Sequence, residues 1–267
     1  MNRIDSTLGN NRKQGKKSLI LFLSAGDPDL ITTERLIPDI FDAGADVIEI
    51  GVPFSDPLAD GPTIQASFTK ALKKGVTLKN ILGMVTRVRK KTDKPLVLMS
   101  AFNLIYKYGI KEFARDASKA GVDGVILPDL IPEEAVDILP LLHAKGIHPI
   151  FLAAPTSGTE RLRKISRVSK GFLYYISLKG ITGGKKPSVK EIKDQVTQIR
   201  SVSKLPVACG FGISTPEQAA DIAKVCDGVI IGSALVKLIG KKGSKAENRN
   251  ASIRFVKRVR SAIDKAK

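Results

Sequence analysis

The chain contains no tryptophan, two cysteines and two histidines, and only 5% of its 267 residues are aromatic. Cys209 and Cys226 form no CxxC pair, which argues against a disulfide framework and indicates a reducing compartment. Cys209 is expected to be a small core residue. His143 and His148 lack the spacing of metal ligands, so no metal site is predicted.

Long apolar runs are also missing. No run approaches the roughly 20 residues that a helix needs to cross a bilayer. The basic stretch 12–17 precedes an apolar run that is too short for a secretory signal and is typical of a strand. These observations predict a cytoplasmic protein. Hydrophobic residues still make up 43% of the chain, enough for the core of one large α/β domain.

Acidic residues are scarce beside basic ones. There are 26 Asp and Glu against 44 Lys and Arg, a net charge of +18. The basic clusters 87–94, 161–170, 237–245 and 254–267 interleave charges with apolar residues at helical spacing, which is typical of the solvated faces of amphipathic helices. Nucleic-acid binding is the alternative, although these clusters lack stacking aromatics. The charge favours acidic and phosphorylated ligands.

Eight short apolar runs alternate with helical patterns, and most are hydrophobic enough for parallel strands buried on both faces. The predicted strands are 18–24, 46–51, 95–100, 123–127, 148–153, 171–177, 206–210 and 227–232. The predicted helices are 33–43, 78–90, 110–120, 133–145, 159–169, 189–202, 216–224, 233–239 and 251–266, with another in the interval 51–78 and an additional one at the N-terminus. This alternation predicts an α/β fold, a (β/α)8 TIM barrel in which residues 1–267 form a single domain. A doubly wound sheet is the alternative.

The stretch 48–62 passes from an apolar strand into a proline-rich loop and carries three carboxylates. Glu49 lies inside the strand, so burial is expected to raise its pKa toward neutrality, as suits a group that gives and takes a proton. A structural Glu paired with a buried cation is the alternative. Asp60 lies in the loop and is expected to stay more polar and ionised, or to cap a turn or the following helix. Asp56 is the weakest catalytic candidate, since it is also explained by a turn.

Glycine-bearing segments follow the last three predicted strands, at 180–184, 210–214 and 232–234. In barrels, the loops after strands 7 and 8 often bind phosphate through backbone N–H groups. These segments therefore predict a phosphate site, although glycine is ordinary in turns. By strand alternation, Tyr174 or Tyr175 should point into the barrel mouth. An apolar pocket for a planar ring is expected from Phe22, Leu127 and Phe211, for which ordinary core packing is the alternative.

The chain resembles the tryptophan synthase alpha subunit family. The residues after Glu49, IGVPFSDPLADGPTIQ, match that family's signature, and further matches run along most of the chain. They include FLSAGDP at 22–28, GVDGVILPDL at 121–130, KGITGG at 179–184, GFGISTPEQ at 210–218 and GSALVK at 232–237. The resemblance implies a barrel lyase that cleaves indole-3-glycerol phosphate to indole and glyceraldehyde 3-phosphate in a retro-aldol reaction.

The resemblance also implies roles for single residues. Glu49 corresponds to the general acid/base and Asp60 to the carboxylate that binds the indole N–H. The implied phosphate-binding positions are Gly183, Phe211, Gly212, Gly232 and Ser233. The implied supporting positions are Tyr174 and Thr182, with Thr182 on a loop that closes over the substrate.

A partner is implied as well. The family's alpha subunit binds a beta subunit that carries pyridoxal phosphate (PLP), in an αββα heterotetramer, and indole passes to the beta site through a tunnel. The loop 53–60 and the segment after Thr182 are expected near that contact. No PLP or other cofactor is expected in this chain.

The chain departs from common family patterns at residues 100–104, at Gly184-Lys185 and at Ile131. These positions bear on the pocket wall, loop closure and beta-subunit contact rather than on Glu49 or Asp60. Indole-3-glycerol phosphate synthase is the rival enzyme, but it needs a catalytic lysine within a strand and no predicted strand offers one. A chain kept only to activate its partner, or a basic scaffold for nucleic acid, is the non-enzyme alternative, against which both acids argue.

Overall fold

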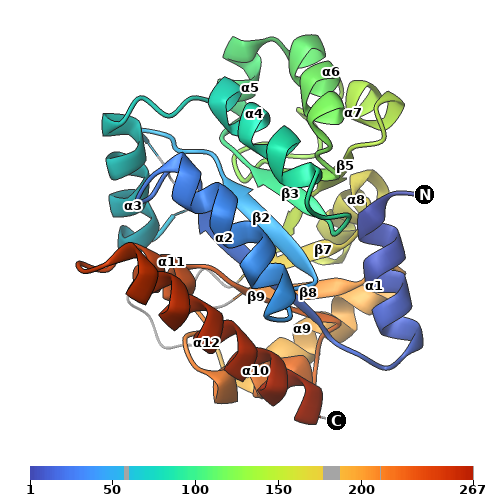
Figure 1. Cartoon of the computed structure of the whole chain (residues 1–267). Helices are drawn as coiled ribbons and strands as arrows, with labels where there is room; N and C mark the ends of the chain where they lie inside the picture. Colours follow the sequence, from blue (N-terminus) through green and yellow to red (C-terminus); the bar gives the residue numbers. More distant parts are fainter. Residues whose placement is uncertain (57–59, 177–186, 211, 267) are drawn as a thin grey trace.

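A barrel of parallel strands lies inside a layer of helices in the computed structural model, which describes residues 1–56, 60–176, 187–210 and 212–266 (Figure 1). The strands follow the order β5-β4-β3-β2-β1-β9-β8-β7-β6. They are β1 (Ser18–Ser24), β2 (Val47–Gly51), β3 (Leu96–Met99), β4 (Gly124–Ile126), β5 (His148–Ile150), β6 (Leu152–Ala153), β7 (Leu173–Ile176), β8 (Val207–Gly210) and β9 (Gly228–Ile231). The terminal strands of this order, β5 and β6, are consecutive in the chain and separated only by Phe151, so the sheet closes on itself. The predicted (β/α)8 barrel is confirmed.

Helices connect the strands, and an additional helix precedes β1 as predicted. They are α1 (Arg3–Lys13), α2 (Leu30–Asp42), α3 (Pro62–Lys73), α4 (Leu78–Arg89), α5 (Phe102–Tyr108), α6 (Ile110–Ala120), α7 (Leu139–Ala144), α8 (Thr159–Val168), α9 (Val189–Val202), α10 (Pro216–Ala223), α11 (Ser233–Ile239) and α12 (Lys245–Lys265). None of the helices within the described ranges is long and apolar enough to cross a membrane.

Two helix predictions were wrong in extent, and one short helix was not predicted. The helix predicted at 133–145 covers only α7, because Pro140 lacks an N–H and fits only the first turn of a helix. The helix predicted to start at Ala251 begins at Lys245, where the Ser244 side chain accepts a hydrogen bond from the Glu247 N–H. The short helix that was not predicted is α5, which begins three residues after the end of β3.

The core has two layers. Side chains from nearly every strand fill the barrel interior: Ile20, Val47, Val97, Ile126, Ile150, Tyr174, Ala208 and Ile230. Alternate residues of the same strands, such as Ile48 and Tyr175, belong to the larger cluster between the barrel and the helices. This alternation decides which side chains reach the barrel mouth.

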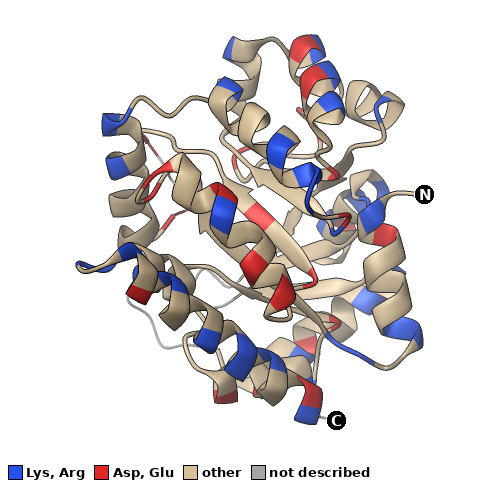
Figure 2. Cartoon of the chain, in the orientation of Figure 1, with Lys and Arg blue, Asp and Glu red and all other residues tan. Residues whose placement is uncertain are grey.

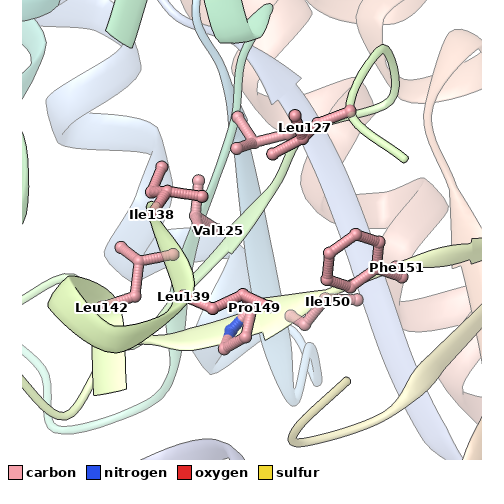
Figure 3. A pocket seen from close by; sticks show the side chains of 9 residues that line it. Val125, Leu127, Ile138, Leu139, Leu142, Pro149, Ile150 and Phe151 are labelled. Atoms are coloured by element: carbon pink, nitrogen blue, oxygen red, sulfur yellow. The ribbon is translucent and has the colours of Figure 1, made fainter. Parts of the chain in front are cut away.

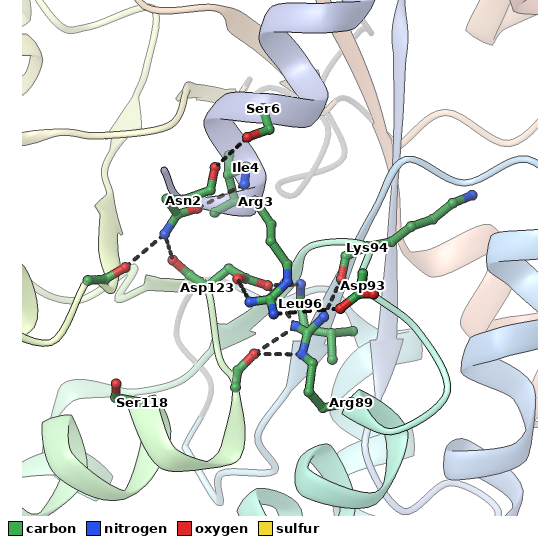
Figure 4. A network of polar contacts seen from close by, with 12 residues as sticks. Asn2, Arg3, Ile4, Ser6, Arg89, Asp93, Lys94, Leu96, Ser118 and Asp123 are labelled. Atoms are coloured by element: carbon green, nitrogen blue, oxygen red, sulfur yellow. Dashed lines mark hydrogen bonds and ion pairs between the residues drawn. The ribbon is translucent and has the colours of Figure 1, made fainter.

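Helix α1 closes the N-terminal end of the barrel. Ile4 and Leu8, on one face of α1, are buried against the interior cluster. Figure 4 shows the polar contacts beside them, in which Asn2 donates to the Asp123 backbone oxygen at 2.8 Å and Arg3 and Arg89 reach the Asp123 carboxylate at 3.1 and 2.7 Å. This end of the barrel is sealed by apolar and polar contacts together.

The excess of basic residues lies on the outside of the helices. Figure 2 shows bands of Lys and Arg along α12, and Arg254, Lys257 and Arg258 in that helix are exposed. The interpretation of the basic clusters as solvated helix faces agrees with this arrangement.

Candidate active site

Glu49 lies on β2 inside the barrel. It is two residues after Val47, which belongs to the interior cluster, and it stands beside Phe22 of β1 and Val97 of β3 in the strand register. Its side chain is 0% exposed, and both carboxylate oxygens lack a hydrogen-bond partner among the described residues. Burial raises the pKa of Glu49 to about 8. The carboxyl group is therefore mostly protonated at neutral pH, and no cation from the described part of the chain pairs with it.

Phe22 forms the apolar side of this region. An added Cβ at Gly51 would stand 2.3 Å from Phe22 Cζ, so the ring lies directly on the backbone at the end of β2. On the other side, an added Cβ at Gly232 would meet Phe22 Cβ at 3.4 Å. Phe22 thus lies between β2, which carries Glu49, and the end of β9, and the lack of a side chain at Gly51 leaves room for its ring.

Helix α3 supplies part of the same apolar cluster. Phe68 packs against Phe22, with ring centroids 6.5 Å apart, and Ile64 and Met99 adjoin them. Phe68 and Ile64 were not among the predicted pocket residues. Their spacing of four residues, in the helix expected within 51–78, is a signal that would have indicated a shared face.

Asp60 stands immediately before α3. Its side chain does not cap that helix, because the N-cap is Gly61, and it is the Asp60 backbone oxygen that accepts a hydrogen bond from Gln65. Burial raises the pKa of Asp60 to about 6. The surroundings of Asp60 are therefore less polar than expected, yet its carboxyl group is mostly ionised at neutral pH. Asp56 is exposed and accepts a hydrogen bond from Ser55 Oγ at 2.7 Å, as the turn interpretation predicts.

Tyr174 links the two acids electrostatically. It belongs to the interior cluster, whereas Tyr175 belongs to the outer one, so one tyrosine of the pair faces inward as predicted. Burial, together with the negative charges of Glu49 and Asp60, raises the pKa of Tyr174 well above its usual range. Both acids therefore lie within electrostatic reach of Tyr174.

Three of the predicted phosphate-site and loop residues, Thr182, Gly183 and Phe211, lie outside the described residues. Gly212 is exposed with a φ of 60°, in the left-handed region. Gly232 is the N-cap of α11, and Ser233 is its first residue. Backbone N–H groups in the first turn of a helix have no intrahelical acceptor, so α11 directs such groups outward beside Phe22.

Leu127 lies apart from Phe22 in the core. It follows β4 and belongs to the cluster between barrel and helices. Figure 3 shows it at the edge of a small apolar cavity of about 10 Å³, with Val125, Ile138 and Phe151. This volume holds at most about one water molecule. A role for Leu127 in a substrate pocket stays a prediction.

The described residues contain no group of three His, Cys, Asp or Glu side chains able to hold a metal ion. The chemistry that the described site offers is thus a neutral, dry carboxyl group, an ionised carboxylate and an apolar ring, beside a helix N-terminus. That set suits proton transfer on a substrate with an aromatic and an anionic part.

Comparisons with known proteins identify the family of the chain. The family model for the tryptophan synthase alpha chain matches residues 8–265. The tryptophan synthase alpha chain of Geobacter sulfurreducens is 48% identical over 263 residues, which cover 98% of this chain and 99% of that one. The solved tryptophan synthase subunit alpha of Legionella pneumophila superposes with a TM-score of 0.92 at 41% identity, covering 99% of both chains. A tryptophan synthase structure from M. tuberculosis, in its aminoacrylate-bound form, gives 0.88 at 33% identity, covering 98% of this chain and 100% of that one.

These matches also determine the biological setting. In this family, PLP belongs to the beta subunit, which is the partner of the alpha chain. The chain belongs to the tryptophan synthase alpha chain family, the lyases of tryptophan biosynthesis that cleave indole-3-glycerol phosphate to indole and glyceraldehyde 3-phosphate and pass the indole to the beta subunit.

Proposed function

We propose that Glu49 is the general acid and base of the cleavage. Its pKa of about 8 keeps the carboxyl group protonated at neutral pH, so it enters the reaction as an acid. It donates this proton to C3 of the indole ring, and the ring nitrogen takes the positive charge. Burial without a partner supports this role, because nothing in the described residues competes for the proton.

The carboxylate left on Glu49 then acts as a base. It takes the proton of the side-chain hydroxyl next to C3, and the oxygen electron pair forms the carbonyl of glyceraldehyde 3-phosphate. The C–C bond breaks, and its electron pair returns to the ring and neutralises the nitrogen. Glu49 ends the cycle protonated, so one residue supplies and recovers the same number of protons.

Asp60 is proposed to bind the indole N–H and to stabilise the cation that forms on the ring. This role needs an ionised carboxylate, and a pKa of about 6 leaves most Asp60 side chains charged at neutral pH. Partial burial strengthens the interaction, since the charge is less screened than in water. Two carboxyl groups with different pKa values thus divide proton transfer and charge stabilisation between them.

The phosphate group is proposed to bind Gly232 and Ser233 at the start of α11, together with Gly183, Phe211 and Gly212. The first-turn N–H groups of α11 suit an anion. Phe22 and Tyr174, with Leu127 as a further candidate, are proposed to surround the ring, and Thr182 to act from the closing loop. Phe22, which touches both the β2 end and Gly232, supports a substrate that spans from ring to phosphate.

The remaining proposals concern assembly and location. We infer that residues 1–267 act as one unit, carry no cofactor of their own, and join two beta subunits and a second copy in an αββα heterotetramer with a tunnel for indole. The loop 53–60 and the segment after Thr182 are proposed to lie near the beta contact. The family's place in biosynthesis and two buried free cysteines support a cytoplasmic location, and no nucleic-acid partner is proposed.

The buried, unpartnered carboxyl group of Glu49 is the observation that carries the mechanism. The test is indole release from indole-3-glycerol phosphate by the wild type, Glu49→Gln and Asp60→Asn, each alone and with a cognate beta subunit. Loss of general acid–base catalysis is expected to lower kcat of Glu49→Gln by about 10²- to 10⁴-fold. Asp60→Asn is expected to lose kcat as well, since the amide cannot balance the ring cation.

The matched control is Asp56→Asn, assayed without the beta subunit. Asp56 is exposed and bonded to Ser55, so its activity should equal that of the wild type. Undiminished activity in Glu49→Gln would refute the role of that residue. An inactive wild type, even with the beta subunit, would favour the activator alternative.

A further inference from the structure

A second cavity lies between two outer helices. It has a volume of about 550 Å³, within the range of small-molecule sites. We call it the α2–α12 cavity, and its principal lining residues are Thr32, Arg35, Leu36 and Asp39 of α2 and Lys245 and Arg249 of α12. None of the residues lining it belongs to the candidate active site. Figure 1 shows α2 and the red α12 side by side.

The helix periodicity explains the lining. Positions 32, 35, 36 and 39 of α2 follow the spacing of three and four residues that defines one helix face. Positions 245 and 249 are one turn apart in α12 and face them. The cavity is therefore formed by regular helix surfaces rather than by a loop.

Two ion pairs join the helices across this cavity. Arg249 Nε and Nη2 donate to the two carboxylate oxygens of Asp39, each at 2.6 Å. Lys245 Nζ lies 2.7 Å from Asp29 Oδ2, at the N-cap of α2. Such bidentate and short contacts hold the helices at a fixed separation, so the cavity between them keeps its shape.

The cations of the cavity outnumber its anions. Four basic side chains line it, Arg35, Lys91, Lys245 and Arg249, against one carboxylate, Asp39. Arg35 is exposed and has neither an ion pair nor a side-chain hydrogen bond among the described residues. Lys91 has only a long contact, 3.8 Å, to Glu34. The cavity thus offers at least one guanidinium with all its donors available and one weakly held ammonium group.

The wall also has an apolar part. Leu36, Pro38, Ile239 and Ala246 line the cavity beside these charges. An inorganic ion would leave that surface uncovered, whereas an organic ligand would bury it. A guanidinium binds planar or tetrahedral oxyanions through paired hydrogen bonds, and phosphate carries the higher charge that several neighbouring cations favour.

We propose that the α2–α12 cavity binds a small organic phosphate, with Arg35 as its anchor and Lys91 beside it. The phosphate contacts the two basic side chains, and the organic part lies against Leu36 and Ile239. This is a site separate from the one that holds the phosphate of the substrate. The basic side chains of this cavity take no part in the proposed cleavage reaction.

The test is calorimetric titration of the full-length chain with ATP, with adenosine as the probe that lacks phosphate. Saturable binding of ATP and none of adenosine is expected. Arg35→Gln should weaken ATP binding about tenfold or more, since a charge-assisted contact is lost. Arg35→Lys keeps the charge and loses the guanidinium, so its affinity for ATP should lie between those of the wild type and Arg35→Gln. Because Arg35 is exposed and unpaired in the described structure, both variants are expected to fold.

The matched control is Arg254→Gln, which removes the same charge from an exposed position of α12 outside the cavity and should bind ATP as the wild type does. Ser233→Ala should also leave ATP binding unchanged, which separates this site from the substrate phosphate site. Equal weakening in Arg254→Gln would reduce the effect to general surface charge and overturn the proposal. Absence of saturable binding, or binding lost in Ser233→Ala and kept in Arg35→Gln, would overturn it as well.

Discussion

The barrel buries one carboxyl group at its N-terminal end and another in its interior, and the two groups have opposite surroundings. At the N-terminal end, the Asp123 carboxylate accepts hydrogen bonds from Arg3, Arg89 and the backbone N–H of Leu96, at 2.7 to 3.1 Å. In the interior, neither oxygen of Glu49 accepts a hydrogen bond from the described residues. Three donors therefore hold the Asp123 carboxylate, whereas burial without a partner among the described residues raises the pKa of Glu49 to about 8.

This contrast indicates that Asp123 contributes to the stability of the barrel, whereas Glu49 is available for chemistry. In barrels, residues at the N-terminal end serve stability and those toward the C-terminal end serve catalysis. A satisfied carboxylate stabilises the closure by α1, and an unsatisfied one remains available to a substrate. Burial alone therefore does not distinguish the two acids, whereas the presence or absence of hydrogen-bond partners among the described residues does.

The largest expected effect concerns the pH dependence of stability in Glu49→Gln. The folded-state pKa of Glu49, about 8, lies above its ordinary value of 4.5, so the wild type loses stability as pH rises between these values. The loss is on the order of 5 kcal/mol at most, from about 1.4 kcal/mol for each pH unit. Glu49→Gln lacks this titration, so it should become the more stable protein as pH rises to 8.

Chemical denaturation of both proteins at several pH values from 4 to about 9 measures this difference. Toward the acid end of this range the difference in their free energies of unfolding should level off, because Glu49 then becomes protonated in the unfolded state as well as in the folded state. A difference that did not change across the whole range would mean that burial does not raise the pKa of Glu49 in the folded protein.

The second largest effect is expected from a substitution of Asp123 at the N-terminal end of the barrel. Asp123→Asn removes the charge that Arg89 meets at 2.7 Å, and the Arg89 side chain is only 13% exposed. Leaving a buried cation without its partner should lower the free energy of unfolding by about 3 kcal/mol. The activity of the protein that remains folded should equal that of the wild type. Denaturation and indole release on the same samples check both parts, and a loss of kcat without a loss of stability would contradict the division between the two ends.

A smaller effect is expected where Phe22 touches the end of β2. In Gly51→Ala, the new methyl group would overlap the Phe22 ring, whose nearest carbon lies 2.3 Å from the added Cβ. Such overpacking costs about 1–3 kcal/mol, and displacement of the ring should also lower indole release. Gly83→Ala in α4 is the control, because its added Cβ meets nothing closer than 3.8 Å. Equal stability and equal indole release in Gly51→Ala and Gly83→Ala would show that the Phe22 ring can move aside without a loss of stability.

Much of the barrel could be predicted because its strands are buried on both faces and read as apolar runs. The extent of α7 could not be read from apolar spacing, since the constraint comes from the missing N–H of Pro140. The start of α12 was missed because the residues before Ala251 are basic and polar without an apolar period. The Ser244-Lys245-Ala246-Glu247 sequence does carry a capping signal, which would have placed that start correctly.

The sequence indicated which two acids belong to the site, but it did not indicate the pKa of Asp60. An acidic residue within an apolar strand indicated the burial of Glu49 directly. The pKa of Asp60 depends on the surroundings of the loop, which no local pattern encodes, and it was therefore expected closer to the ordinary value. The packing of Phe68 against Phe22, 46 residues earlier in the chain, likewise depends on how α3 lies on the barrel.

The smallest effect is expected from Asp93→Asn, and it sharpens the comparison between the two ends. Asp93 belongs to the same polar cluster as Asp123, and its carboxylate lies 3.7 Å from Arg3 Nη2, but its side chain is 96% exposed. Solvent and salt screen such a pair, so the free energy of unfolding should change by less than about 1 kcal/mol. Urea denaturation of Asp93→Asn and Asp123→Asn under identical conditions makes the comparison. A loss in Asp93→Asn as large as that in Asp123→Asn would show that the network acts as one unit through Arg3, and that burial of the acid is not what decides its contribution.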